Sequence, residues 1–208
     1  MSPDHFGLYF LAVAVAVFTP GPAVMTGITS SIRYGFPSAM IAALGCVTAT
    51  GLMGALSAMG LGAVIMASGL LFDIIRYVGA AYLIWLGWRM WANSRKAAVP
   101  QNMARMTEKP RLIRLYLRGF MVSASNPKAI AFFTALFPMF LDPDAPLMAQ
   151  FLILDGTFVV MSFAAIVGYS ALAARSRAFL AGSARRWFDR ISGSIFVAFG
   201  IALAASHK

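Results

Sequence analysis

Six long apolar segments run through the 208-residue chain, at about residues 6–31, 38–66, 70–92, 116–141, 147–173 and 190–205. A helix needs about 20 apolar residues to cross the hydrocarbon of a bilayer, and all but the last segment reach that length. The chain is 60% hydrophobic and only 12% charged, about half the charged fraction of soluble domains. A soluble core of this size could not bury so much apolar surface. The pattern therefore predicts an all-α membrane protein with about six transmembrane helices.

Basic residues gather in alternate connections between these segments. Of the 17 Lys and Arg residues, seven lie in residues 93–118 and five in residues 174–190, and the turn near Arg33 carries one more. Because Lys and Arg are enriched in cytoplasmic loops, we expect these odd-numbered connections in the cytoplasm and both termini outside. The net charge of +10 then reflects topology rather than nucleic-acid binding. The same connections can contact anionic lipid headgroups.

The long basic connection at 93–118 divides the chain into two halves, about residues 1–92 and 119–208, of a single transmembrane domain that covers 1–208. Each half holds three apolar segments. If the halves are related, an odd number of helices per half makes them inverted in the membrane.

Two pairs of similar motifs support a relation between the halves. Arg76-Tyr-Val-Gly79 and Arg190-Ile-Ser-Gly193 occupy corresponding places in the third and sixth segments. A proline motif also interrupts the first and the fourth segment. We therefore expect two inverted three-helix repeats with proline-broken first and fourth helices.

Thr19, Pro20, Gly21 and Pro22 form the first interruption, in the middle of an apolar segment. Each proline removes a backbone donor and clashes with the preceding turn, at about 3 kcal/mol in an ordinary helix interior. The freed carbonyl groups need partners in hydrocarbon, so the break must face protein or a wet cavity. A structural kink is the alternative, but two prolines around a glycine favour a break that lines a site.

Asn126, Pro127 and Lys128 form the second interruption, and Lys128 is the only Lys or Arg well inside an apolar segment. A cation at depth costs about 3 kcal/mol on insertion scales and faces the bundle interior or water. Lys128 lies about 15 Å from the cytoplasmic end of its segment, roughly as deep as Pro22. We expect the two breaks to meet at this depth. Snorkelling of Lys128 to the interface is the alternative.

Asp155 is the only carboxylate clearly inside an apolar segment. Because an unpaired charge in the membrane is costly, Asp155 should be paired or protonated. Lys128 is the candidate partner. A carboxylate that gains and loses a proton is also what proton coupling requires, and a fixed structural ion pair or a place near the outer interface remain alternatives.

The chain lacks the residues that several kinds of chemistry require. Cys46 is the single cysteine, and His5 and His207 are both terminal. There is no nucleotide-binding loop of the Gly-x-x-x-x-Gly-Lys-Ser/Thr type. We therefore expect no enzyme activity, no metal centre and no cofactor.

Four motifs are shared with a known group of membrane proteins: Thr19-Pro-Gly-Pro22, the third-segment run Tyr77-Val-Gly-Ala-Ala-Tyr-Leu-Ile-Trp-Leu-Gly87, Asn126-Pro-Lys-Ala129 and Ile191-Ser-Gly193. Over essentially its whole length the chain resembles the LysE/RhtB family of amino-acid and metabolite exporters. The resemblance implies a six-span protein of the bacterial inner membrane that is driven by the proton gradient. It also implies that both proline motifs line the translocation path. Asp155 matches no motif of the family.

These observations lead to one hypothesis and two rivals. The hypothesis is a secondary active exporter of a small zwitterion, in which Lys128 attracts the carboxylate and freed carbonyl groups accept from the ammonium group. Asp155 then carries the coupling proton or neutralises Lys128.

A divalent-cation exporter would need more ligands than one intramembrane carboxylate. A non-transporting assembly protein would tolerate Lys128→Ala without loss of export. A homo-oligomer is compatible with each reading.

Overall fold

The computed structural model describes residues 3–67, 69–93, 110–142, 145–175 and 183–205. Within these ranges the chain is helical and contains no strand. The elements are α1 (Pro3–Phe18), α2 (Pro22–Tyr34), α3 (Phe36–Ala67), α4 (Gly69–Asn93), α5 (Leu112–Ala124), α6 (Pro127–Ala131), the π-helical turn η1 (Phe132–Leu136), the 3₁₀ turn η2 (Phe137–Phe140), α7 (Leu147–Arg175) and α8 (Ser183–Ala205). The predicted all-α class is confirmed.

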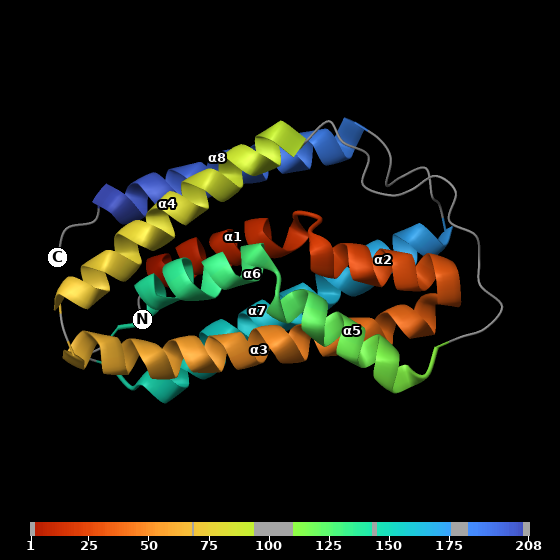
Figure 1. Cartoon of the computed structure of the whole chain (residues 1–208), viewed down its shortest axis with the longest axis horizontal. Coiled ribbons are helices and arrows are strands. Elements are labelled where there is room, and N and C mark those ends of the chain that lie inside the picture. Colours follow the sequence, from red (N-terminus) through yellow and green to blue (C-terminus); the bar gives the residue numbers. More distant parts are fainter. Residues whose placement is uncertain (1–2, 68, 94–109, 143–144, 176–182, 206–208) are drawn as a thin grey trace.

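The helices run up and down along the long axis of the molecule (Figure 1). The start of α1 and the end of α8 lie toward one end, together with the junction of α3 and α4. The ends of α2, α4 and α7 lie toward the opposite end, which is the end that leads into the basic connections. This arrangement agrees with the expected alternation of connections.

Two helical stretches are long and apolar enough to cross a membrane, Phe36–Gly60 and Leu147–Arg175. The pair His5–Phe18 and Pro22–Tyr34 makes a third if it is counted as one bent span, and Pro127–Phe140 is a shorter apolar stretch. The chain is therefore a multi-pass membrane protein. Of the expected six spans, length and hydropathy alone establish two or three among the described residues.

Both predicted helix breaks are present. Residues 19–21 separate α1 from α2, and the two helices meet at an angle of 45°. Ser125 and Asn126 separate α5 from α6. The broken helices place both interruptions near the middle of the bundle (Figure 1).

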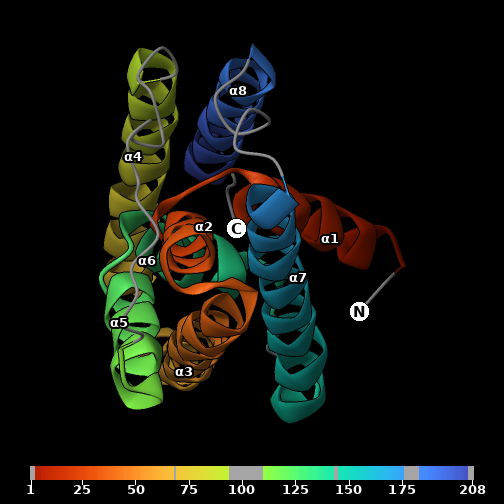
Figure 2. The same cartoon turned by 90° about the vertical axis from the view of Figure 1, so that its right-hand side faces the viewer.

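The last helix is longer than its apolar segment. α8 begins at Ser183 and contains 23 residues, whereas the apolar run begins only at about residue 190. α8 packs against α4 with their backbones in close contact: a Cβ atom on Gly87 would lie 2.4 Å from the Gly193 carbonyl oxygen. The two helices stand side by side on one side of the bundle (Figure 2). Small residues allow such close approach in membranes.

Glycines also bring α3 and α5 together. A Cβ atom on Gly119 would lie 2.0 Å from the Ala42 carbonyl oxygen, and one on Gly45 would lie 2.0 Å from the Tyr116 carbonyl oxygen. Real Cβ atoms do not approach backbone oxygens so closely. A side chain at either position must therefore push α3 and α5 apart, which would move the break that follows α5.

We expect Gly119→Ala to destabilise the protein, because overpacking a tight contact costs about 1–3 kcal/mol. Thermal unfolding of the purified protein in detergent measures the effect. Gly168→Ala is the matched control, since a Cβ atom on Gly168 meets nothing within 4 Å. Equal unfolding temperatures for the two variants would contradict the close α3–α5 contact.

Candidate functional site

The two helix breaks are joined by a hydrogen bond. The Lys128 Nζ atom donates to the Thr19 carbonyl oxygen at 2.7 Å. The end of the same side chain lies over Gly21, where a Cβ atom would stand 3.2 Å from Nζ. Gly21 therefore leaves the room that the Lys128 ammonium group occupies. The structure brings together the predicted site residues Thr19, Gly21 and Lys128.

The first break is stabilised by side chains that replace missing backbone donors. Pro22 has no N–H group to give to the Phe18 carbonyl oxygen, and the Tyr169 hydroxyl donates to that oxygen instead at 2.7 Å. The Thr19 hydroxyl turns back to the Val15 carbonyl oxygen at 2.6 Å, beside the Thr19 backbone N–H, which donates to the same oxygen at 3.3 Å. The break is thus an ordered element of the bundle.

The second break is built around a helix cap. The Asn126 Oδ1 atom accepts from the Lys128 backbone N–H at 3.1 Å, which makes Asn126 the N-cap of α6. Pro127 follows at the first helical position, where its missing N–H is no loss. The Tyr82 hydroxyl of α4 donates to the Pro127 carbonyl oxygen at 3.2 Å. The cap fixes the direction in which the Lys128 side chain leaves the helix.

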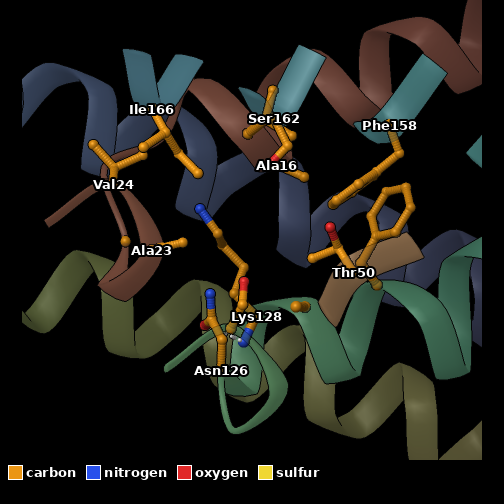
Figure 3. A pocket seen from close by; sticks show the side chains of 14 residues that line it. Ala16, Ala23, Val24, Thr50, Asn126, Lys128, Phe158, Ser162 and Ile166 are labelled. Atoms are coloured by element: carbon orange, nitrogen blue, oxygen red, sulfur yellow. Dashed lines mark hydrogen bonds between the residues drawn. The ribbon is translucent and has the colours of Figure 1, made fainter. Parts of the chain in front are cut away.

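A small pocket lies where the breaks meet (Figure 3). Its lining consists of Ala16, Val17, Gly21, Ala23, Val24, Thr50, Ser123, Asn126, Lys128, Ala129, Phe132, Phe158, Ser162 and Ile166. Its volume is about 30 Å³, which is room for a water molecule and not for an amino acid. The structure therefore shows the site closed.

The pocket combines one cation with several neutral hydrogen-bonding groups. Lys128 and Asn126 come from the second break, and the hydroxyl groups of Thr50, Ser123 and Ser162 come from α3, α5 and α7. Lys128 extends into the space between the walls that carry Ala23, Val24 and Ile166 on one side and Thr50 and Phe158 on the other (Figure 3). Such a set can bind a small molecule that carries an anionic group and further polar groups.

The three hydroxyl residues were not singled out by the sequence. The Thr50 hydroxyl bonds back to its own helix, since it donates to the Val47 carbonyl oxygen at 3.1 Å. It lines the pocket as well. Ser123 and Ser162 belong to no motif, and only their burial, 1% and 8% exposed, marks them in the folded chain.

Asp155 lies outside the lining of this pocket. The side chain is buried on α7, and its Oδ1 atom has no hydrogen-bond partner. A Cβ atom on Gly54 would lie 2.0 Å from Oδ1, so the carboxyl group fills a notch in α3. The structure thus separates Asp155 from the group formed by Thr19, Gly21, Asn126 and Lys128.

No cluster suited to a metal ion is seen in the described part of the chain, where no three His, Cys, Asp or Glu side chains come together. The ammonium group of Lys128 would also repel a cation at the pocket.

The model of the LysE type translocator family matches residues 14–207. The chain belongs to the LysE family. A relative in Salmonella typhimurium, the homoserine/homoserine lactone efflux protein, is 34% identical over 208 residues, which cover 100% of this chain and 99% of the relative. An uncharacterized membrane protein of Vibrio cholerae is 31% identical over 199 residues, or 95% of each chain. No solved structure matches the chain.

Both break motifs lie inside the matched region, so the pocket is part of the LysE-family domain. The family match also places this chain among translocators. The resemblance drawn from the Pro-Gly-Pro and Asn-Pro-Lys motifs is confirmed.

We expect Asn126→Ala to lower the stability of the LysE-family protein by about 1 kcal/mol, because α6 loses its N-cap. Ser125→Ala is the control at the neighbouring position, where the exposed hydroxyl only bonds back to the Met121 carbonyl oxygen. Thermal unfolding in detergent compares the two. If Asn126→Ala unfolds no earlier than Ser125→Ala, the cap does not hold the second break.

Proposed function

We propose that this LysE-family protein is a secondary active exporter of amino acids or closely related metabolites across the bacterial inner membrane. The observation that carries the proposal is the Lys128 ammonium group, held at the junction of two helix breaks and lining a closed pocket. The Salmonella typhimurium relative is named as an efflux protein for homoserine and homoserine lactone, which supports the direction of transport and the class of substrate.

Lys128 is the group that recognises a carboxylate. A cation deep in a membrane is energetically costly, so it is retained where it binds an anion or a strong dipole. The N-terminus of α2 begins beside it, with Gly21 as N-cap. Helix N-termini favour negative charge, so the start of α2 adds to the attraction of Lys128 for an anion. A substrate carboxylate at this place meets both.

The hydrogen bond between Lys128 and Thr19 suggests how a zwitterion enters. A carboxylate is a stronger acceptor for the ammonium group than a carbonyl oxygen. When the substrate carboxylate takes over Lys128, the Thr19 carbonyl oxygen is released and can accept from the substrate ammonium group. Both charged ends of an amino acid are then satisfied by exchanging one protein–protein bond for two protein–substrate bonds. Ser123 and Ser162, which also line the pocket, lie within reach of a polar substrate side chain.

The closed pocket fits alternating access. A volume of about 30 Å³ is too small for an amino acid, so the walls must separate for binding. In the proposed arrangement six spans form two inverted halves, and the two breaks are the corresponding places at which each half bends. The basic connections lie in the cytoplasm, and the termini lie outside. The proton gradient drives export.

We expect Lys128→Met to reduce homoserine efflux from loaded cells by at least about tenfold, because a charge-assisted hydrogen bond contributes about 1.5–3 kcal/mol. Efflux of homoserine lactone, which has no carboxylate, should fall less. Arg114→Ala removes an exposed cation outside the pocket and should leave both rates near those of the parent.

The comparison between the two substrates separates a binding role of Lys128 from a structural one. Equal losses for homoserine and its lactone would show that Lys128 only supports the fold of the site. Parent-level export of homoserine by Lys128→Met would contradict the proposed site altogether. Absence of export by the parent would favour an assembly role, and screening of divalent cations in the same cells would test the other rival.

We also expect export against a homoserine gradient to stop when a protonophore is added to proteoliposomes. Downhill exchange at equal pH should continue. Accumulation that persists with the protonophore present, and that follows an imposed sodium gradient instead, would contradict proton coupling.

A further inference from the structure

The carboxyl group of Asp155 is fitted into a notch between helices. Asp155 is 7% exposed, and its two oxygen atoms face glycines of α3. A Cβ atom would lie 2.0 Å from Oδ1 if placed on Gly54 and 3.6 Å from Oδ2 if placed on Gly51. Any larger residue at Gly54 would occupy the place of the carboxyl oxygen. The backbone of α3 therefore leaves room here for the Asp155 carboxyl group alone.

The Oδ1 atom of Asp155 has no hydrogen-bond partner. The nearby donors are used elsewhere: the Ser57 hydroxyl of α3 donates to the Phe133 carbonyl oxygen, and the Tyr9 hydroxyl of α1 donates to the Leu154 carbonyl oxygen at 2.7 Å. A buried carboxylate without hydrogen bonds is strongly disfavoured relative to the neutral acid.

Each described element around Asp155 contributes a different group. α1 contributes the Tyr9 phenol, which interacts electrostatically with the carboxyl group. The facing positions of α3 are the two glycines, and η1 contributes the ring of Phe133. α6 carries Lys128, whose ammonium group is directed to the Thr19 carbonyl oxygen. These surroundings hold a carboxylic acid more readily than its anion.

An aromatic layer stands between this carboxyl group and the pocket. Phe132, Phe133 and Phe158 pack against one another with ring centroids 4.7–5.4 Å apart. Phe132 and Phe158 line the pocket, whereas the Phe133 ring lies at the Gly54 notch. A substrate in the pocket and a ligand on Asp155 would therefore occupy separate places, connected through the same three rings and through α7.

We propose that Asp155 is the proton-binding site of the exporter, separate from the amino-acid pocket and divided from it by the layer of Phe132, Phe133 and Phe158. The proposal rests on the proposed function for its coupling role. In the closed conformation the carboxyl group holds its proton. When α3 and α7 separate, water reaches the notch, the O–H bond breaks, and the proton passes to water and leaves a carboxylate. A proton rather than a metal cation is the ligand, because the glycines and the Phe133 ring offer no set of oxygen ligands.

The decisive experiment uses Asp155→Asn, which keeps the shape of the neutral acid and cannot release a proton. In proteoliposomes with homoserine on both sides at equal pH, we expect exchange within about twofold of the parent. When a pH gradient is imposed, the parent should accelerate at least about tenfold and Asp155→Asn should not. Asp142→Asn, the same change at an exposed carboxyl group, should respond like the parent.

Two outcomes of this experiment would overturn the proposal. Acceleration of Asp155→Asn by the pH gradient would show that the proton binds elsewhere. Loss of equal-pH exchange in Asp155→Asn, to the level of Lys128→Met, would place Asp155 in the substrate site.

A second measurement does not require transport. Dicyclohexylcarbodiimide modifies protonated carboxyl groups in apolar surroundings, so the unmodified protein should be labelled at Asp155, with labelling that falls as pH rises. Absence of label at every pH would overturn the proton site. If Asp155 is labelled in this manner but the parent exchanges no homoserine, the proton site stands and the proposed substrate class fails.

Discussion

The structure depends on the rule that every backbone polar group in hydrocarbon must find a partner inside the protein. The two proline motifs break this rule locally, and the fold repairs each break with side chains from distant helices. Tyr169 and Lys128 donate hydrogen bonds to carbonyl oxygens at the first break, and Tyr82 donates one to a carbonyl oxygen at the second. The Lys128–Thr19 bond is the repair that uses a charge. An anionic ligand can therefore displace this hydrogen bond. The same contact thus contributes both to the stability of the break and to ligand binding.

The two ends of the bundle are packed by different kinds of side chains. Toward the end that holds the start of α1 and the junction of α3 and α4, large rings fill the core, including Tyr9, Phe133 and Phe137, each at most 2% exposed. Toward the basic end, small aliphatic residues and hydroxyl groups fill it, and the Ser31 hydroxyl reaches the Ser170 carbonyl oxygen at 2.8 Å. A seam with hydroxyl groups can be hydrated at lower cost than a layer of rings. The end that leads into the basic connections is thus the easier end to hydrate, which fits the proposed loading from the cytoplasm.

The sequence predicted the elements that follow from local chemistry. Proline removes donors wherever it occurs, so both breaks were expected, and a lysine inside an apolar segment must face polar surroundings, so Lys128 was expected at the site. Thr50, Ser123 and Ser162 were not expected there, because a lone hydroxyl in an apolar helix can always bond its own backbone. Only the packing of α3, α5 and α7 decides which hydroxyl faces the pocket. The extension of α8 to Ser183 was missed because its first turns are polar.

Asp155 shows most clearly where sequence reasoning ends. Its position in an apolar segment marks it as unusual, but its environment depends on two glycines that lie about a hundred residues earlier, on α3. Only the tertiary contact reveals that the carboxyl group fills a notch and that rings stand between it and the pocket. A cation and a carboxyl group on opposite sides of an aromatic layer cannot neutralise each other by direct contact through that layer. In the proposed cycle each is balanced by its own ligand, the cation by an anionic substrate and the carboxyl group by a proton. This division of charge gives a reason for two ligands to move in one transport cycle.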